Sequence, residues 1–368
     1  MNRRSFLAAG LWSLSASPLL AAFRSQQWDK AIDVLEQATN SKQVNAAVLH
    51  VIHKGTAVTQ HFGSAATGDA MFLLGSISKP ICMTALMALY DEGKFALDDL
   101  AQKYLPGFRG DGRESATIRH LLTHTSGLPD QLPNNNDLRR EQAPLDRFVE
   151  ETLKTPLSFA PGTKYQYSSM GIMLAARIAE QLSGTDIHTL VDQKVFQPLG
   201  MQHSAQGLGQ FQLVDFVPCQ LEGAAPESGS GDPTAKNWDW NSLYWRKLGA
   251  PWGGTHASAP DIGRFLTDFL HRSGKAVSPE TAKLMTSNHN PPGLTQRGLG
   301  FVVGLAAGSP GCSDKSFGHT GSTGTVCWAD PATDTVCAVL TSLPGRAINP
   351  HPRELASMSV AEAVRNVR

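Results

Sequence analysis

The amino-acid sequence predicts an α+β protein: an antiparallel sheet flanked by helices, formed from both chain ends, with an inserted mostly helical region. Three observations lead to this fold class. Strand-like stretches lie near both ends of the chain, residues 76–195 mostly carry apolar residues at helical spacing, and Lys54-Gly55 separates two alternating stretches like a hairpin turn. The expected strands are residues 44–53, 56–62, 298–305, 315–320, 324–330 and 335–342.

The expected helices follow the apolar periodicity. Residues 168–182 place Ile172, Ile178 and Leu182 on one helix face, and Ser183-Gly184 ends that helix. A helix should also begin close to Ser76, because the nearby Pro80 is tolerated only in a first helical turn. The other expected helices are residues 28–40, 116–124, 143–153, 185–194, 259–270 and 352–367.

The length of 368 residues suits two domains, or one domain with a large insertion. We expect residues 23–85 and 250–368 to form an α/β sheet domain, and residues 86–249 to form a helical insertion with a tryptophan-rich loop. The insertion would close one side of a cleft. Ser76 lies where the chain passes from strands into helices, which is the natural place for that cleft.

The tryptophan-rich loop leaves two interpretations open. An apolar wall that receives an acyl or aromatic group is one, and a local core that holds a long loop together is the other. Its aromatic residues are Trp238, Trp240, Tyr244, Trp245 and Trp252.

Composition limits the partners. Lys+Arg and Asp+Glu both number 32, and no basic cluster is present, so we expect no nucleic-acid partner. After the N-terminal segment, no stretch reaches the roughly 18 uninterrupted apolar residues of a membrane span. The expected partner is a small-molecule or peptide substrate, and the oligomeric state is left open.

Residues 1–22 are typical of an export signal. Arg3-Arg4 precede an apolar stretch at residues 7–20, and Ala21-Ala22 offer a cleavage point, although Leu20 is not the small residue preferred before it. Paired arginines before Ser-Phe-Leu resemble a twin-arginine signal, with a general secretory signal as the alternative. Either route predicts a periplasmic or secreted protein.

Ser76 and Lys79 are the first candidate catalytic residues. Three apart on a helix, they share one face, so the amine can take the hydroxyl proton and leave Ser76 as a nucleophile. The start of a helix also favours negative charge that develops at the hydroxyl. Taken alone the spacing is weak, because chance supplies roughly one Ser-x-x-Lys in a chain of this length.

Two later segments supply complementary groups. Tyr167 stands at an expected helix start, and its phenol can serve as a general base only if a cation such as Lys79 lowers its pKa from about 10. In the small-residue stretch 317–324, Gly321 removes any Cβ obstruction, and the Ser322 N–H is the expected donor to a substrate carbonyl oxygen. His319 and the next residue, Thr320, point to opposite faces of a strand, so either one can face the cleft.

These three segments resemble the motifs of serine β-lactamases and penicillin-binding proteins, which run Ser-x-x-Lys, Tyr-x-Asn and Lys/His-Thr-Gly. The order and separations are similar to the class C β-lactamase branch, with its DD-peptidase and esterase relatives. Residues 93–99, 104–106, 118–128 and 253–261 support the likeness, which runs from about residue 30 to 345. The segments that carry it are Ser76-Ile77-Ser78-Lys79, Tyr167-Ser168-Ser169 and His319-Thr320-Gly321.

The resemblance implies a β-lactamase/transpeptidase-like fold and a role for each matched residue. Ser76 would be the acylated nucleophile, Lys79 its proton partner and Tyr167 the general base or acid. The N–H groups of Ser76 and Ser322 would form the oxyanion hole. Neither a cofactor nor a metal is implied. The residues that would bind substrate are Ser169, His319, Thr320 and Gly321.

Two departures from the family pattern bear on the substrate. Ser169 replaces an Asn, and serine offers one short hydroxyl where asparagine offers a carbonyl and an NH₂ group. His319 replaces the Lys of many β-lactamases, so a fixed cation becomes a group that titrates near neutrality. We therefore expect a serine hydrolase for small esters, amides or D-amino-acid peptides. The alternatives are a penicillin-binding or sensor-type protein that turns over very slowly, and a true β-lactamase.

The five cysteines leave the redox state open, because an odd number leaves at least one thiol free. If Asp330 and Asp334 paired across a hairpin turn, Cys327 and Cys337 would face each other, and a cross-strand disulfide would be possible. Two small buried side chains are the preferred interpretation.

Overall fold

The computed structural model describes residues 26–365, so the export signal expected at residues 1–22 lies outside the described residues. The two ends of the chain meet in one six-stranded antiparallel sheet, with the order β2-β1-β9-β8-β7-β6. Its strands are β1 Ala46–His53, β2 Thr56–Gly63, β6 Val302–Val303, β7 Phe317–Gly321, β8 Thr325–Asp330 and β9 Thr335–Thr341. The predicted α+β fold with a sheet formed from both chain ends is confirmed.

A smaller three-stranded sheet and several helices complete the described part of the chain. The small sheet has the order β3-β5-β4, from β3 Phe72–Leu73, β4 Ser204–Gln206 and β5 Thr255–Ala257. The first six α-helices are α2 Asp29–Asn40, α3 Ser78–Asp91, α4 Ile118–Leu122, α5 Asn135–Arg140, α6 Leu145–Lys154 and α7 Ser169–Ser183. The others are α8 Ile187–Val191, α9 Gln197–Leu199, α10 Leu243–Leu248, α11 Ala259–His271, α12 Pro279–Met285 and α13 Pro352–Arg365.

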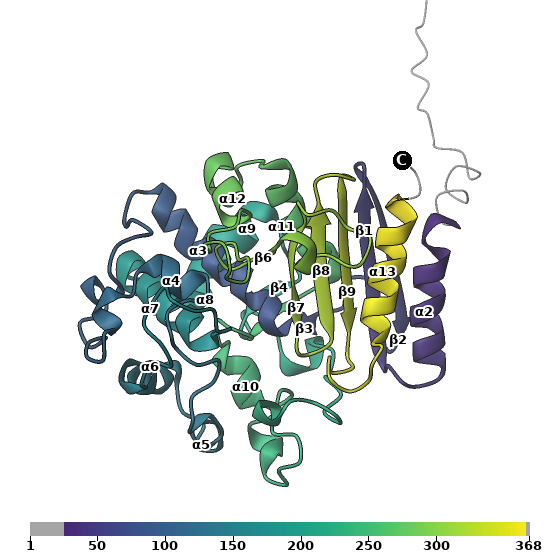
Figure 1. The fold of residues 1–368 in the computed structure, drawn as a ribbon. Helices are drawn as coiled ribbons and strands as arrows, with labels where there is room; N and C mark the ends of the chain where they lie inside the picture. Colours follow the sequence, from purple (N-terminus) through teal and green to yellow (C-terminus); the bar gives the residue numbers. More distant parts are fainter. Residues whose placement is uncertain (1–25, 366–368) are drawn as a thin grey trace, which may run out of the picture.

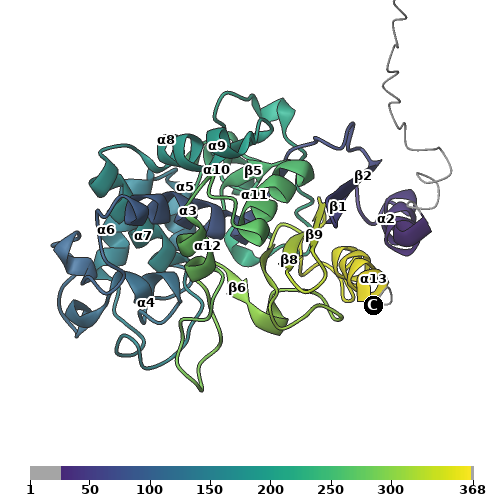
Figure 2. The same ribbon diagram turned by 90° about the horizontal axis from the view of Figure 1, so that it is seen from above.

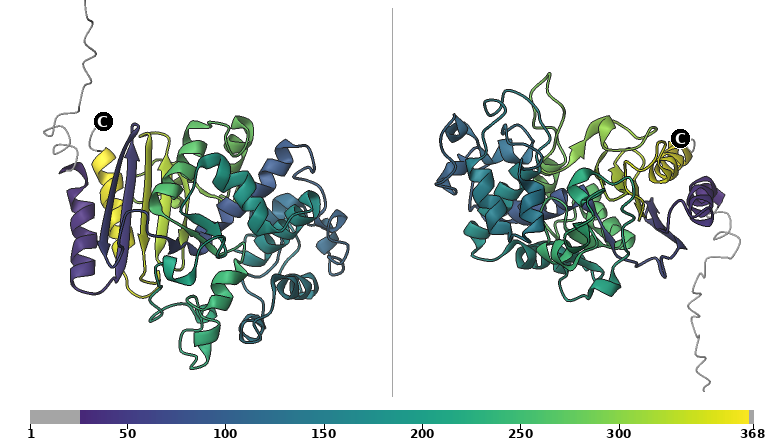
Figure 3. Two further views of the ribbon diagram at one scale, coloured as in Figure 1. Left: turned by 180° about the vertical axis from the view of Figure 1, so that it is seen from behind. Right: turned by 90° about the horizontal axis from the view of Figure 1, so that it is seen from below.

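Helices cover both faces of the large sheet. The terminal helices α2 and α13 pack side by side on one face, and α11 packs against β1, β8 and β9 on the other (Figures 1 and 2). Beyond α11, the helices α4 to α8 lie on the side away from the termini, as the views from behind and below also show (Figure 3). The boundary between the sheet and this helical region is where the candidate site is expected.

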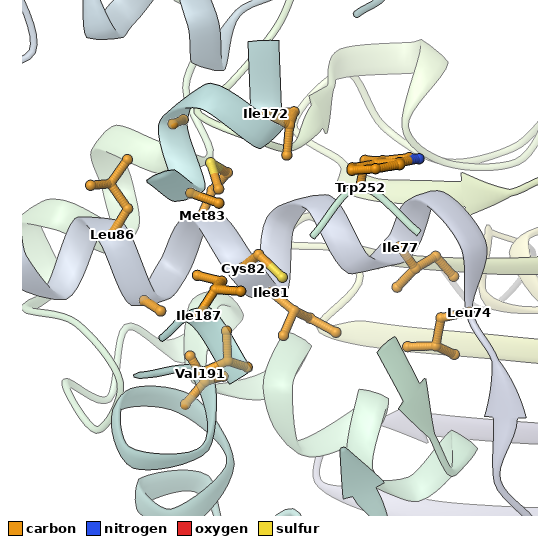
Figure 4. Packing of buried hydrophobic residues seen from close by; sticks show 14 of the residues in the cluster. Leu74, Ile77, Ile81, Cys82, Met83, Leu86, Ile172, Ile187, Val191 and Trp252 are labelled. Carbon is orange, nitrogen blue, oxygen red and sulfur yellow. The ribbon is translucent and has the colours of Figure 1, made fainter. Parts of the chain in front are cut away.

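The helix α3 is the central element of the larger hydrophobic core. Residues 78–89 of this helix are all buried. Figure 4 shows Ile81 and Met83 of α3 among side chains from α7 and α8, with Trp252 close to the start of the helix. Because this packing surrounds α3, the residues at its N-terminus are held rigidly.

Some local predictions were wrong. Of the expected strand 298–305, only Val302–Val303 is a strand. The expected helix 116–124 is shortened to α4, Ile118–Leu122, and His124 lies outside it with a φ of 62°. Across the last hairpin, Asp330 pairs with Thr335 rather than with Asp334.

This register separates the two cysteines considered for a bridge. Cys327 lies opposite Ala338, and Cys337 lies opposite Trp328. All five cysteines, each within the described residues, are free thiols. The preferred interpretation of Cys327 and Cys337 as small buried side chains is confirmed.

A search of residues 26–365 finds no helix long and apolar enough to cross a membrane.

Candidate active site

Ser76 lies in a short 3₁₀ helix, η2 Gly75–Ile77, that leads directly into α3. Lys79 follows one turn later and donates a hydrogen bond from Nζ to Ser76 Oγ over 2.9 Å. A second hydrogen bond, also of 2.9 Å, runs from Nζ to the carbonyl oxygen of Trp252. Ser76 and Lys79 therefore lie within the distance that a proton transfer requires.

Lys79 is buried without a carboxylate partner among the described residues, since its two hydrogen bonds are to a hydroxyl and a carbonyl. Burial lowers the pKa of its amine to about 7, and the negative charge of Asp130 partly opposes this effect. Near neutral pH, a substantial fraction of Lys79 is therefore uncharged and able to accept a proton.

Tyr167 directly precedes Ser168, whose hydroxyl caps α7 by accepting a hydrogen bond from the Gly171 N–H. The Tyr167 hydroxyl interacts with the Ser76 side chain, and Lys79 Nζ lies 4.8 Å from the centre of the phenol ring. Burial raises the pKa of this phenol well above its usual value. The shift is opposite to the one that a general base requires, so the phenol stays protonated and is suited to donate a proton.

Tyr165 contacts a different group. Its hydroxyl accepts hydrogen bonds from Arg297 Nε, over 3.0 Å, and from Arg297 Nη2, over 2.7 Å.

Tyr167 packs against His124. The two ring centres are 4.6 Å apart, and burial lowers the pKa of this histidine well below its usual value. Tyr167 rather than Tyr165 thus faces Ser76.

The strand β7 brings His319 and Thr320 to the same cavity. His319 is buried, and burial holds its pKa well below the usual value, so this imidazole is neutral and not the titrating group that its type suggests. Its Nδ1 donates to the carbonyl oxygen of Thr320 over 2.7 Å. Nε2 is then an acceptor, and it has no partner within the described chain.

The end of β7 and the start of β8 contact the segment that precedes Ser76. Thr325 Oγ1 donates to the carbonyl oxygen of Leu74 over 2.7 Å. A Cβ atom built on Gly75 would lie 3.1 Å from the amide nitrogen of Ser322. The two backbone segments that carry the expected oxyanion donors, Ser76 and Ser322, therefore run next to each other.

A cavity of about 380 Å³ connects these groups, a size suited to a small ligand. The predicted residues that line it are Ser76, Tyr167, Ser169, His319, Thr320, Gly321 and Ser322. Three of the four tryptophans of the tryptophan-rich loop, Trp240, Trp245 and Trp252, also line it, and all three are buried in the larger core. The apolar wall and the local core, the two interpretations of this loop, are thus the same group of side chains.

Sequence reasoning missed several charged residues of this cavity. Asp130 Oδ1 accepts hydrogen bonds from Ser169 N, over 3.1 Å, and from Ser169 Oγ, over 2.6 Å. Asp130 lies two residues after the supporting segment 118–128, and this position could have directed attention to it. Arg139 and Arg297 also line the cavity, and no local pattern marks either of them.

Within residues 26–365, no group of three His, Cys, Asp or Glu side chains could hold a metal ion.

The fold and these contacts define a class of enzyme. Its site lies between a sheet and a helical region and contains a serine next to a buried lysine and a tyrosine. The family model described as Beta-lactamase matches residues 31–357, so the chain belongs to the Beta-lactamase family. It is a serine hydrolase of this family.

The chain is similar to curated proteins named "Putative D-alanyl-D-alanine carboxypeptidase". One, from Escherichia coli (strain K12), is 26% identical over 343 residues, which cover 84% of this chain and 78% of the relative. Another, from Salmonella enteritidis PT4, is 28% identical over 307 residues, or 76% of this chain and 71% of the relative.

Solved structures share the fold at low sequence identity. The hydrolase EstCE1 matches with a TM-score of 0.70 and 19% identity, covering 93% of this chain and 100% of that one. A D-amino acid amidase from Ochrobactrum anthropi SV3 gives a TM-score of 0.74 and 20% identity, covering 93% and 99%. A penicillin-binding protein homologue from Caulobacter crescentus gives a TM-score of 0.74 and 20% identity, covering 92% and 97%.

Alanine at Gly321 should damage the site more than alanine at Gly253. At Gly321 the new Cβ would overlap the Leu74 carbonyl oxygen and Thr325 Oγ1, whereas at Gly253 the nearest atoms, in Gly75, lie 3.9 Å away. We expect Gly321→Ala to lower the free energy of unfolding by about 1–3 kcal/mol and to reduce ester turnover. Denaturant unfolding and kinetics of both variants measure this, and equal behaviour would contradict the close approach of β7.

Proposed function

We propose that this enzyme hydrolyses small esters, amides or D-amino-acid peptides through an acyl-enzyme on Ser76. The observation that carries the proposal is the 2.9 Å contact between Ser76 Oγ and Lys79, a buried amine whose pKa is lowered to about 7. Neutral Lys79 takes the hydroxyl proton while Ser76 Oγ attacks the substrate carbonyl carbon. The N–H groups of Ser76 and Ser322 stabilise the oxyanion that forms.

Departure of the leaving group uses Tyr167 as the proton donor. When the carbonyl re-forms, the bond to the leaving group breaks, and the proton held by Lys79 returns through Tyr167 to that group. Water then attacks the acyl-enzyme, releases the acid and restores the Ser76 hydroxyl. A protonated phenol fits this relay, because burial raises the pKa of Tyr167.

The substrate preference rests on the cavity wall. Ser169, His319, Thr320 and Gly321 all line the cavity and would contact the substrate. The names of the curated relatives support D-amino-acid peptides. β-Lactams rank lower, because Ser169 lacks the amide of asparagine and a neutral His319 stands where many β-lactamases have a lysine cation.

We also propose that residues 1–22 direct export by the twin-arginine route, so that the mature enzyme acts in the periplasm or outside the cell. The paired arginines Arg3 and Arg4 support this proposal.

Turnover of a short-chain p-nitrophenyl ester should greatly exceed turnover of a chromogenic cephalosporin. Loss of ester turnover in Ser76→Ala is the control for the nucleophile. Efficient cephalosporin hydrolysis would identify a true β-lactamase instead. A stoichiometric adduct on Ser76 without turnover of either compound, seen by mass spectrometry, would identify the slowly deacylating binder.

The kcat/KM for the ester should rise with pH through about 7, because Lys79 accepts the proton only when its amine is neutral. Asp130→Asn should move this rise to lower pH, since the Asp130 charge raises the pKa of Lys79. Profiles of both proteins between pH 5 and 9 measure the shift. A rise that stays in place, or moves to higher pH, would contradict Lys79 as the base.

Replacing both Arg3 and Arg4 with Lys should block export, because twin-arginine signals depend on this pair whereas general secretory signals need only positive charge. The fraction of enzyme in the periplasm, measured after cell fractionation, should fall at least tenfold. Undiminished export of the double variant would identify a general secretory signal.

A further inference from the structure

Arg139 is a buried arginine on the wall of the active-site cavity, and it has no carboxylate partner in the described chain. Its side chain is 1% exposed. Its guanidinium carbon lies 3.7 Å from the ring centre of Trp245, and Nη1 donates to the backbone carbonyl of Glu227. Burial lowers the pKa of Arg139 to about 10, so it remains a cation at neutral pH.

A short series of contacts joins Arg139 to the reacting groups. The ring of Trp245, on which Arg139 lies, is 6.2 Å from the ring of Trp252, centre to centre. The backbone carbonyl of Trp252 holds Lys79 Nζ at 2.9 Å. Arg139 thus belongs to the part of the cavity wall that the tryptophans build, two aromatic rings away from the Ser76–Lys79 pair.

Hydrogen-bond donors around this wall lack acceptors. Arg139 Nε and Trp245 Nε1 are both buried without a partner among residues 26–365, and both side chains line the cavity. A buried cation without a counter-charge costs free energy, and a bound anion offsets that cost. A carboxylate is planar and accepts hydrogen bonds at two oxygens, which suits the edge of a guanidinium, and the indole N–H of Trp245 is a second donor on the same wall.

Glu227 is the competing internal partner. It lines the same cavity, and its charge raises the pKa of Arg139, but the contact between the two residues is made through the Glu227 backbone. Its carboxylate therefore leaves the Nε edge of Arg139 without an acceptor.

We propose that Arg139 and Trp245 form a subsite for a carboxylate at the far end of the substrate's acyl group. The preferred substrates are then half-esters or half-amides of dicarboxylic acids. This inference rests on the proposed acyl-enzyme at Ser76. The distal carboxylate does not react: Ser76 attacks the ester carbonyl, the alcohol leaves with the bonding electron pair and a proton, and water releases the dicarboxylic acid.

The test compares p-nitrophenyl hemiglutarate with p-nitrophenyl pentanoate, which carries a methyl group in place of the distal carboxylate. Wild-type enzyme should favour the hemiglutarate by about tenfold or more in kcat/KM, mainly through KM, as one charge-assisted contact provides. Arg139→Gln should abolish this preference and Arg139→Lys should keep part of it. Arg140→Gln is the matched control, because Arg140 is an exposed neighbour on α5 that pairs with Asp137 and Asp232.

Two further variants test the subsite. Trp245→Phe keeps an aromatic ring beside Arg139, removes the indole N–H and leaves a small cavity in the core, so the preference should fall and the melting temperature should drop modestly. Glu227→Gln removes a competing anion and should raise the preference. If Glu227→Gln instead lowers stability and leaves the preference unchanged, Arg139 only balances Glu227 and the proposal fails.

Calorimetric binding of glutarate makes the result independent of turnover. Wild-type enzyme should bind glutarate at least tenfold more tightly than Arg139→Gln does, and Arg140→Gln should match wild type. If neither ester is turned over but this difference in glutarate binding remains, the proposed function fails and the subsite stands. Equal binding by wild type and Arg139→Gln, or equal substrate preference in Arg139→Gln and Arg140→Gln, overturns the subsite.

Discussion

The burial of the Lys79 amine is the constraint on which the rest of the site depends. Among residues 26–365, an ammonium ion in this position would find hydrogen-bond acceptors only in a hydroxyl and one backbone carbonyl, so the surroundings favour the neutral amine. That preference converts an ordinary lysine into a proton acceptor near neutral pH. The tight packing at the start of α3 keeps Lys79 in place next to the hydroxyl of Ser76 and the carbonyl of Trp252.

The chain brings the reacting groups together by closing the large sheet with both of its ends. The pairing of β1 with β9 fixes the C-terminal strands, and β7 is then carried to the segment that holds Ser76. Thr325 fastens β8 to the carbonyl of Leu74, just before η2. Gly321 is required there because any side chain would enter the space that this carbonyl occupies. Residues about 250 positions apart thus share one cavity.

The sequence predicted the parts of this arrangement that depend on local spacing. Apolar periodicity located α7, α11 and α13 closely, and the three motifs located the serine, lysine and tyrosine. It failed where the outcome depends on distant neighbours. The last hairpin pairs Asp330 with Thr335, a register that packing selects and composition does not. The pKa of Tyr167 rises because burial outweighs the hydrogen bond with Ser76 and the charge of Arg297, and no sequence pattern reports burial at that depth.

Asp130 shows why a departure from a family motif must be judged with its neighbours. Ser169 offers a single hydroxyl, and that hydroxyl is already donated to Asp130 Oδ1 over 2.6 Å. At position 169 the family motif has the amide of an asparagine. This chain instead has a serine next to the carboxylate of Asp130, and both residues line the cavity. A carboxylate acts on Lys79 through its charge, opposing the effect of burial on the pKa of the amine. An amide has no net charge and cannot do so. Asp130, which is remote from Ser169 in the sequence but hydrogen-bonded to it in space, supplies this charge. Ser169 therefore belongs to a different electrostatic arrangement around Lys79 and does not simply replace the asparagine with fewer polar groups.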